Sequence, residues 1–188
     1  MQRFPLILIA LIVLVAIAAG NADAFVKLGC SWPDASHNYD KHTLGNAWQT
    51  AVSNGSVQWN NVTPSSFTWT AQDSGGNDIT FGAVDGSGSI LAVTTTTCVL
   101  GVMVEADIAF DNAESWYKGT GTPAAGQFDA FSVAAHEFGH ALGLDHTNLS
   151  CSGLPKTKPT MCPSIAATET FGRTLHSDDK AGLNDMYP

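Results

Sequence analysis

Three histidines and one glycine between residues 136 and 146 stand at a spacing that suits a metal site. His136 and His140 are four residues apart, so on a helix both imidazoles project from one face and can reach one ion. Gly143 lets the chain leave that helix sharply, and His146 then returns as a third ligand. Three neutral nitrogen ligands suit Zn²⁺ and leave a fourth position open, which is typical of a catalytic site.

Glu137 follows the first histidine and is rotated from it by about 100° around the helix. From that position its carboxylate reaches a zinc-bound water rather than the zinc itself, so we expect Glu137 to be a general base. Two other interpretations are histidines on an exposed helix and a metal that is only structural. A structural site would need neither this glutamate nor an open position, so the spacing favours catalysis.

The elements that must position these residues follow from the spacing of apolar side chains. Helical spacing from Leu44 to Val52 predicts one helix that ends near Gly55, and Asp129 can cap a second helix over about 130–142. Ser177 would begin a last short helix. Alternating apolar residues predict strands within 67–71, 79–84, 90–99 and 102–110, whereas 112–127 reads as a loop. This order of elements indicates an α+β domain.

The N-terminus carries a segment typical of export. Arg3 precedes an uninterrupted apolar run over 6–19, and Ala22-Asp23-Ala24 forms an A-x-A cleavage site. The run is shorter than the roughly 20 residues of a membrane span, although a short membrane anchor is the alternative interpretation. We therefore expect residues 1–24 to be a cleaved signal peptide and 25–188 to be a secreted domain without membrane contact.

Composition narrows the class of partner. The 188 residues include 8 Lys and Arg against 17 Asp and Glu, for a formal charge of −9. Because binding to phosphate needs clustered Lys and Arg, this balance disfavours nucleic acid as a partner. The length suits one domain, and 44% hydrophobic residues argue against a disordered chain. We expect a monomer.

The four cysteines of an exported chain are expected to form disulfides. Cys151 and Cys162 would close a short loop, and Cys30 with Cys98 would then tie the N-terminus to a strand. Four cysteines allow three connectivities, and the sequence alone does not choose among them.

The run from His136 to His146 reads H-E-x-x-H-x-x-G-x-x-H, and with it the chain resembles the metzincin metalloproteases and, within them, the matrixins or matrix metalloproteinases. Three further segments carry the resemblance: Asn61–Phe67, Phe110–Trp116 and the tail 175–187. It implies a twisted mixed sheet with two helices above a cleft, and a small irregular lower part with a C-terminal helix. It also implies a zinc endopeptidase that acts on extended polypeptides outside the cell.

The resemblance assigns further residues. Met161 would form the methionine turn beneath the imidazoles, and an extended substrate would pair with the strand near 91–93. One wall of the S1′ pocket would come from Pro163, Ser164 and Ile165. A calcium site would be built from Asp85, Gly86, Gly88, Ile90, Asp111 and Glu114. An ordinary hairpin turn is the alternative for Asp85 and Gly86.

The sequence departs from the matrixin pattern in places. Val93 and Ala109 stand where matrixins hold a second, structural zinc, so we expect that site to be absent. The inhibitory cysteine segment is missing, and Cys30 as a zinc ligand is the alternative to its disulfide. The 147–160 segment between His146 and Met161 is longer than in most matrixins.

Two further expectations concern the ends and the remaining histidines. We expect the exported chain to be active at once, with the Phe25 amine pairing with Asp178 or Asp179. Histidines outside the motif match no ligand pattern and are expected at the surface: His37, His42 and His176.

Two alternatives to a matrixin-like enzyme remain. One is a metzincin of a different branch, with similar chemistry and another substrate preference. The other is a non-enzymatic zinc-binding or adhesion module on a protease-like fold, against which the presence of Glu137 argues.

Overall fold

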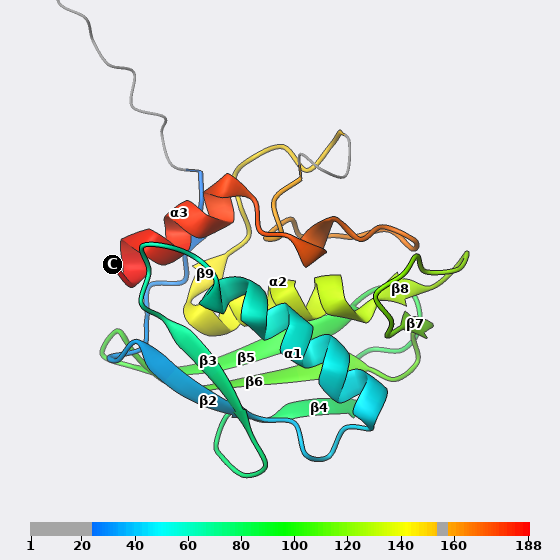
Figure 1. Cartoon of the computed structure of the whole chain (residues 1–188), viewed down its shortest axis with the longest axis horizontal. Coiled ribbons are helices and arrows are strands. Elements are labelled where there is room, and N and C mark those ends of the chain that lie inside the picture. Colours follow the sequence, from blue (N-terminus) through cyan, green and yellow to red (C-terminus); the bar gives the residue numbers. More distant parts are fainter. Residues whose placement is uncertain (1–23, 154–157) are drawn as a thin grey trace, which may run out of the picture.

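The computed structural model describes residues 24–153 and 158–188. The expected signal peptide lies outside the described residues except for Ala24, as do residues 154–157 of the long segment before Met161. Within the described residues, three α-helices pack with a mixed β-sheet, which confirms the α+β class (Figure 1). None of the helices in the described ranges is both long and apolar enough to cross a membrane.

The sheet presents one strand edge beside the helix that carries the histidines. The central strand β6 (Val102–Asp111) pairs with β4 (Ile79–Gly82) in parallel and with β5 (Ala92–Val99) in antiparallel orientation. A parallel pair, β2 (Ser36–Asp40) and β3 (Thr68–Gln72), is joined to this unit by a bridge between Asp40 and Asp78. In the order β4-β6-β5, β5 has a neighbour on one side among the strands that the structure describes, so its other edge is open to pairing.

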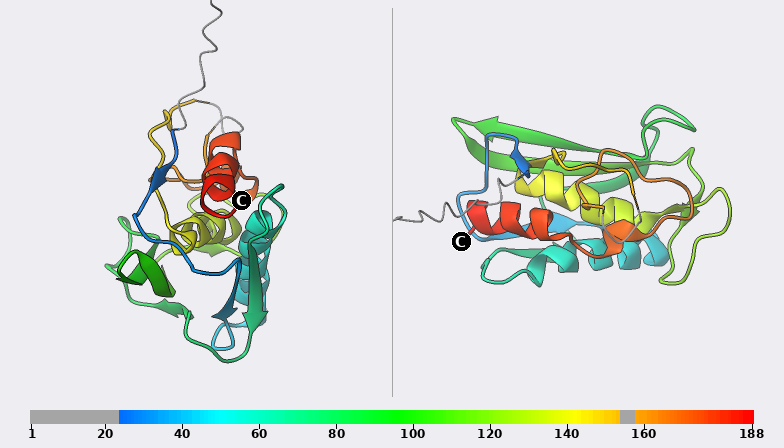
Figure 2. Two further views of the ribbon diagram at one scale, coloured as in Figure 1. Left: turned by 90° about the vertical axis from the view of Figure 1, so that its left-hand side faces the viewer. Right: turned by 90° about the horizontal axis from the view of Figure 1, so that it is seen from above.

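Two long helices lie against this sheet. The view from above in Figure 2 shows α2 (Ala130–Leu142) between β5 and α1 (Asn46–Asn60). The expectation that α1 ends at Gly55 was wrong, because the helix continues to Asn60. A Cβ atom at Gly55 would lie 2.7 Å from the Cβ atom of Ala134, so this glycine lets α1 and α2 approach closely. The close packing offsets the roughly 1 kcal/mol that glycine costs inside a helix.

The small irregular part that the resemblance implies follows α2 and is built from short elements. Strand β9 (Leu144–Asp145) pairs with β1 (Val26–Lys27) in antiparallel orientation, and α3 (Ser177–Met186) closes the chain above the other helices, away from β4 (Figure 1). A short 3-10 helix, η2 (Phe171–Arg173), precedes α3.

The 112–127 segment, expected to be loop, contains one short strand. This strand, β7 (Trp116–Tyr117), pairs in parallel with β8 (Phe128–Asp129), which leads directly into α2. Strands of two residues have no periodicity by which the sequence could reveal them.

Both expected disulfides are present. Cys30 bonds to Cys98 and Cys151 to Cys162. The first disulfide ties the N-terminal segment to β5. Next to it, Ser31 forms a parallel β-bridge with Val102 on β6. The N-terminal segment is thereby held against the end of the β5–β6 hairpin.

Two buried tryptophans fix the position of α2. Trp59 on α1 donates from Nε1 to the carbonyl oxygen of Ala135 at 2.8 Å, and Trp32 donates to the carbonyl oxygen of Ala141 at the same distance. Each indole thus combines a large buried surface with a hydrogen bond to the helix that carries the site.

Candidate metal centre

Two helix signals set the positions of the first two histidines. Asp129 caps α2, accepting a hydrogen bond from the main-chain nitrogen of Ser132 at 2.9 Å. Gly143 ends the helix in the left-handed conformation, with φ of 104°. A Cβ atom there would lie 2.4 Å from the carbonyl oxygen of Cys30, so no other residue fits without a shift of the main chain. The chain turns back at this glycine and brings His146 to the helix.

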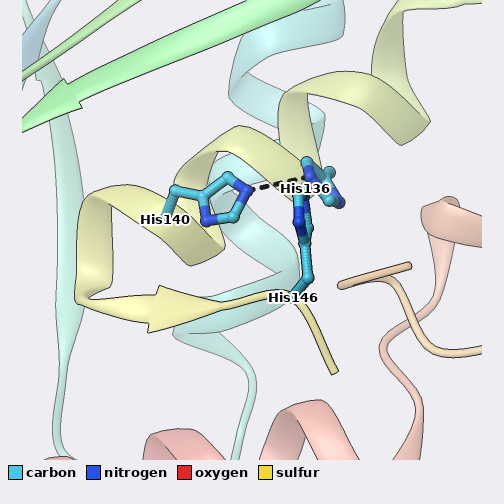
Figure 3. A group of neighbouring side chains, drawn as sticks. All are labelled: His136, His140 and His146. Carbon is cyan, nitrogen blue, oxygen red and sulfur yellow. Dashed lines mark hydrogen bonds between the residues drawn. The ribbon is translucent and has the colours of Figure 1, made fainter. Parts of the chain in front are cut away.

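The three imidazoles converge on one point (Figure 3). Their nitrogen atoms lie within 4.8 Å of one another, and among the residues that the structure describes no other group of three or more His, Cys, Asp or Glu side chains does so. His136 and His140 come from α2, and His146 follows β9. The ligand set predicted from the spacing is therefore brought together.

The hydrogen bonds of two histidines show which nitrogen is free for a metal. Nδ1 of His136 lies 2.7 Å from the carbonyl oxygen of Thr160, and Nδ1 of His140 lies 2.8 Å from that of Leu144. Because a carbonyl only accepts, each Nδ1 carries the proton and each Nε2 carries a lone pair in the neutral ring. The two Nε2 atoms are 3.0 Å apart. Two facing lone pairs at that distance repel each other unless a cation lies beside both, so this donor set fits zinc.

Burial keeps these rings neutral. Burial, with a smaller contribution from the other imidazoles nearby, lowers the pKa of His136 and the pKa of His140 to about 4 in each case. At neutral pH both rings are therefore unprotonated, which is the form that binds a metal.

Glu137 lies beside the histidines and is 5% exposed. Burial raises the pKa of Glu137, and this effect is opposed by nearby His140 and by a hydrogen bond from Thr94. The Thr94 hydroxyl lies 2.6 Å from Oε2 of the glutamate. Sequence reasoning missed Thr94, because it is 43 residues away in the chain and only the packing of β5 on α2 brings it here.

Met161 lies behind the histidines. Its side chain is buried, and its sulfur contacts α2 at Gly139, between the two helical histidines. Asp179 of α3 holds this turn by accepting hydrogen bonds from the main-chain nitrogens of Thr160 at 2.8 Å and Met161 at 3.1 Å. The same turn supplies the carbonyl oxygen that orients His136.

A cleft of about 610 Å³ opens at the three histidines. One side is the β5 region from Leu91 to Thr94, and Glu137 faces the cleft from α2. The segment expected to form one wall also lines it: Pro163, Ser164 and Ile165. The arrangement places an open strand edge, a carboxylate and three nitrogen ligands around one space.

The predicted calcium loop folds onto its two carboxylates. Oδ2 of Asp111 accepts hydrogen bonds from the main-chain nitrogens of Asp85 at 3.0 Å and Gly86 at 2.9 Å. Glu114 accepts one from Gly88, and the Ile90 nitrogen lies 3.3 Å from Oδ1 of Asp85. Here the carboxylates meet main-chain donors, and the calcium site stays a prediction.

The two residues at the positions that the resemblance assigns to a second zinc lie opposite each other in the sheet. Val93 on β5 is the direct cross-strand partner of Ala109 on β6. Neither side chain can ligate a metal, so two of the ligand positions implied by the resemblance hold an apolar pair.

Two of the three histidines expected at the surface have structural contacts. His37 is half-buried and stacks on Trp32 with ring centroids 3.9 Å apart. His176 caps α3, because its Nδ1 accepts from the main-chain nitrogen of Asp178 at 3.2 Å. His42 is half-exposed and lies 2.7 Å from a carboxylate oxygen of Asp40.

In the structure the main-chain nitrogen near Asp178 belongs to Ala24, whereas the expected pairing concerns the amine that cleavage would create at Phe25 and stays a prediction. The Ala24 nitrogen lies 3.1 Å from Oδ1 of Asp178. Phe25 instead packs against α3 at Gly182, where a Cβ atom would lie 3.1 Å from the phenylalanine side chain. Asp179 is occupied by the methionine turn, so the two neighbouring acids have separate roles.

Comparison with known proteins gives one consistent family. A family model described as matrixin matches residues 35–188. Matrix metalloproteinase-20 of Homo sapiens is 41% identical over 83 residues, which are 43% of this chain and 14% of that protein. Matrix metalloproteinase-18 of Xenopus laevis is 36% identical over 147 residues, 74% of this chain and 28% of that protein. Matrix metalloproteinase-16 of Homo sapiens is 32% identical over 146 residues, which are 69% of this chain and 22% of that protein. The chain thus matches less than a third of the length of each of these relatives.

Proposed function

Because this chain belongs to the matrixin family, we propose that it is a zinc-dependent endopeptidase that hydrolyses extended polypeptides outside the cell. One observation carries the proposal. The unprotonated Nε2 atoms of His136 and His140 lie 3.0 Å apart, and Glu137, the residue after His136, places a buried carboxylate beside them. A metal site alone would explain the histidines, whereas hydrolysis also explains Glu137 and the cleft.

His136, His140 and His146 would hold the zinc. Bound there, zinc would polarise the scissile carbonyl and lower the pKa of water toward about 7. The main-chain carbonyls of Thr160 and Leu144 keep two imidazoles in the tautomer that this requires.

Glu137 would move the protons. Its carboxylate takes a proton from the attacking water and later delivers it to the nitrogen of the leaving amine. Burial raises the pKa of Glu137, so the side chain holds this proton more readily between the two steps than an exposed glutamate would.

The substrate would bind as an additional strand. The free edge of β5 runs along the cleft, and main-chain hydrogen bonds near 91–93 would hold an extended peptide there. The wall at Pro163, Ser164 and Ile165 would select the side chain that follows the cleaved bond. A Ca²⁺ ion at the 85–90 loop with Asp111 and Glu114 would brace the start of β5.

The proposal is tested with purified protein, one equivalent of zinc and a library of internally quenched peptides. We expect cleavage inside the peptides, loss of cleavage on adding a zinc chelator, and recovery when zinc is restored. Metal analysis should give about one zinc per chain, because the three histidines supply one ligand set.

The matched variants are Glu137→Gln and Glu105→Gln, the latter at an exposed position on β6. Glu137→Gln should keep its zinc and lose about 10²–10⁴-fold in turnover, whereas Glu105→Gln should behave like the parent. Normal turnover of Glu137→Gln would contradict the mechanism. A zinc-loaded parent protein that binds peptides without cleaving them would instead support a non-enzymatic module.

A further inference from the structure

We propose that Thr94 is a positioning residue for Glu137: its hydroxyl fixes one carboxylate oxygen, so that the other is presented to the cleft. The inference deepens the proposed function and rests on it, because it assigns a partner to the group that would move protons. The role assigned to Thr94 is to set the orientation of the Glu137 carboxylate in the cleft.

The contact is short and directional. Oγ1 of Thr94 lies 2.6 Å from Oε2 of Glu137 and 3.1 Å from the main-chain oxygen of the same residue. A hydroxyl has one proton to donate. The carboxylate oxygen is the stronger of the two acceptors and lies closer, so the hydroxyl donates to Oε2. Within the part of the chain that the structure describes, Thr94 is the one side chain that hydrogen-bonds to the Glu137 carboxylate.

Strand β5 holds Thr94 at this place. Its side chains alternate, with Thr94 partly buried toward α2 and Thr95 exposed on the other face. The register is fixed by β6, where Ile108 is the cross-strand partner of Thr94. Ile108 is 1% exposed, so this pairing lies over the core. A donor on a paired strand is held more firmly than one on a loop.

The effect on chemistry follows from geometry. A glutamate has several rotatable bonds, and in a cleft its carboxylate can turn away from the reacting water. Anchoring Oε2 removes that freedom and leaves Oε1 as the oxygen that meets the water. The loss of the anchor should therefore lower the rate of the chemical step and leave substrate binding nearly unchanged.

The test compares three variants of the zinc-loaded protein. Thr94→Val keeps the shape and removes the hydroxyl, Thr94→Ser keeps the hydroxyl, and Thr95→Val makes the same change on the exposed face. We expect Thr94→Val to lower kcat by about 10-fold or more, with KM changed by less than about twofold and zinc content unchanged. Thr94→Ser and Thr95→Val should both stay close to the parent.

A second measurement does not depend on activity. Crystal structures of the zinc-loaded parent and of Thr94→Val should show one orientation of the Glu137 carboxylate in the parent and several in the variant. The inference is overturned if Thr94→Val keeps its kcat, if Thr94→Ser is impaired equally, or if Thr94→Val loses zinc. A parent crystal structure in which the Thr94 hydroxyl points away from Glu137 also overturns it. A parent that cleaves nothing defeats the proposed function, whereas the crystal structures still decide the role of Thr94.

Discussion

Gly139 lies directly against the sulfur of Met161. A Cβ atom at residue 139 would be 2.2 Å from Sδ of Met161 and 2.8 Å from Cζ2 of Trp59. Gly139 precedes His140 on α2, so the methionine turn packs against the helix immediately behind the metal centre. The absence of a side chain at this position lets the two parts of the site meet.

We therefore expect Gly139→Ala to destabilise the protein and weaken its metal binding. The overlap forces Met161 or α2 to move, which typically costs about 1–3 kcal/mol, and alanine returns up to about 1 kcal/mol through its helix propensity. Urea unfolding and a zinc competition titration measure the two effects. Gly76→Ala is the control, since a Cβ atom there has no neighbour within 4 Å. Equal stability of the two variants would show that the contact is not tight.

The second prediction concerns a buried charge at the start of α2. Asp129 is fully buried and accepts from Nη2 of Arg173 at 2.5 Å and from Nε at 2.9 Å. Arg173→Met would leave that carboxylate without its counter-charge, so we expect a loss of about 3–5 kcal/mol in the free energy of unfolding.

The control for this variant is Lys27→Met. Lys27 pairs with Asp185 at 2.6 Å, but both side chains are about half exposed, and such pairs contribute about 0–1 kcal/mol. Denaturant unfolding of both variants measures the contrast. Similar losses of unfolding free energy in the two variants would mean that Arg173 is solvated and does not neutralise Asp129.

The metal centre could be predicted from the sequence because its ligands are local. Helical spacing fixes His136 and His140, and Gly143 fixes the turn that returns His146. The strands β5 and β6 were also predicted, since their alternation is long enough to be read.

Features that depend on how distant segments pack could not be predicted. Gly55 reads as a helix end in the sequence, and only the nearness of Ala134 shows that it is a contact between helices. Nothing in the sequence around Thr94 indicates its hydrogen bond to Glu137. The pairing of β1 with β9 involves too few residues to leave a pattern in the sequence. Each of these features depends on the relative placement of elements, which local propensity does not encode.

A third prediction follows from the buried histidines. In the folded, metal-free protein burial lowers the pKa of His136 and of His140 to about 4, whereas in the unfolded chain both titrate near about 6.5. Between these values the unfolded chain binds protons that the folded protein does not bind. The free energy of unfolding should therefore fall as pH decreases from about 6.5 toward about 4, and these two groups should contribute no further change above that window.

Urea unfolding of the chelator-treated protein at pH values from about 7 to about 5 measures this dependence, above the range in which most carboxylates titrate. His140→Gln removes one of the two groups and should reduce the slope. An unchanged slope in this variant would mean that His140 is not buried in the metal-free state.

The last prediction compares a chain that begins at Ala24 with one that begins at Phe25. The main-chain nitrogen of Ala24 lies 3.1 Å from Oδ1 of Asp178, whose Oδ2 accepts from the Thr147 hydroxyl at 2.7 Å. Asp178 is only 9% exposed. A chain that starts at Ala24 would place an ammonium group against this carboxylate, whereas a chain that starts at Phe25 would leave Oδ1 without that partner. We expect the Ala24 form to be more stable by about 1 kcal/mol, as typical of hydrogen bonds and ion pairs near a surface.

Thermal unfolding of the two purified forms at neutral pH measures this difference. In Asp178→Asn the difference between the forms should shrink, because the charge that attracts the ammonium is gone. In the exposed Asp185→Asn it should persist. The segment continues into β1, which pairs with β9 immediately before His146, so the Ala24 form should also bind zinc more tightly. Equal stability and equal zinc affinity of the two forms would mean that the Ala24 nitrogen is not held by Asp178 in solution.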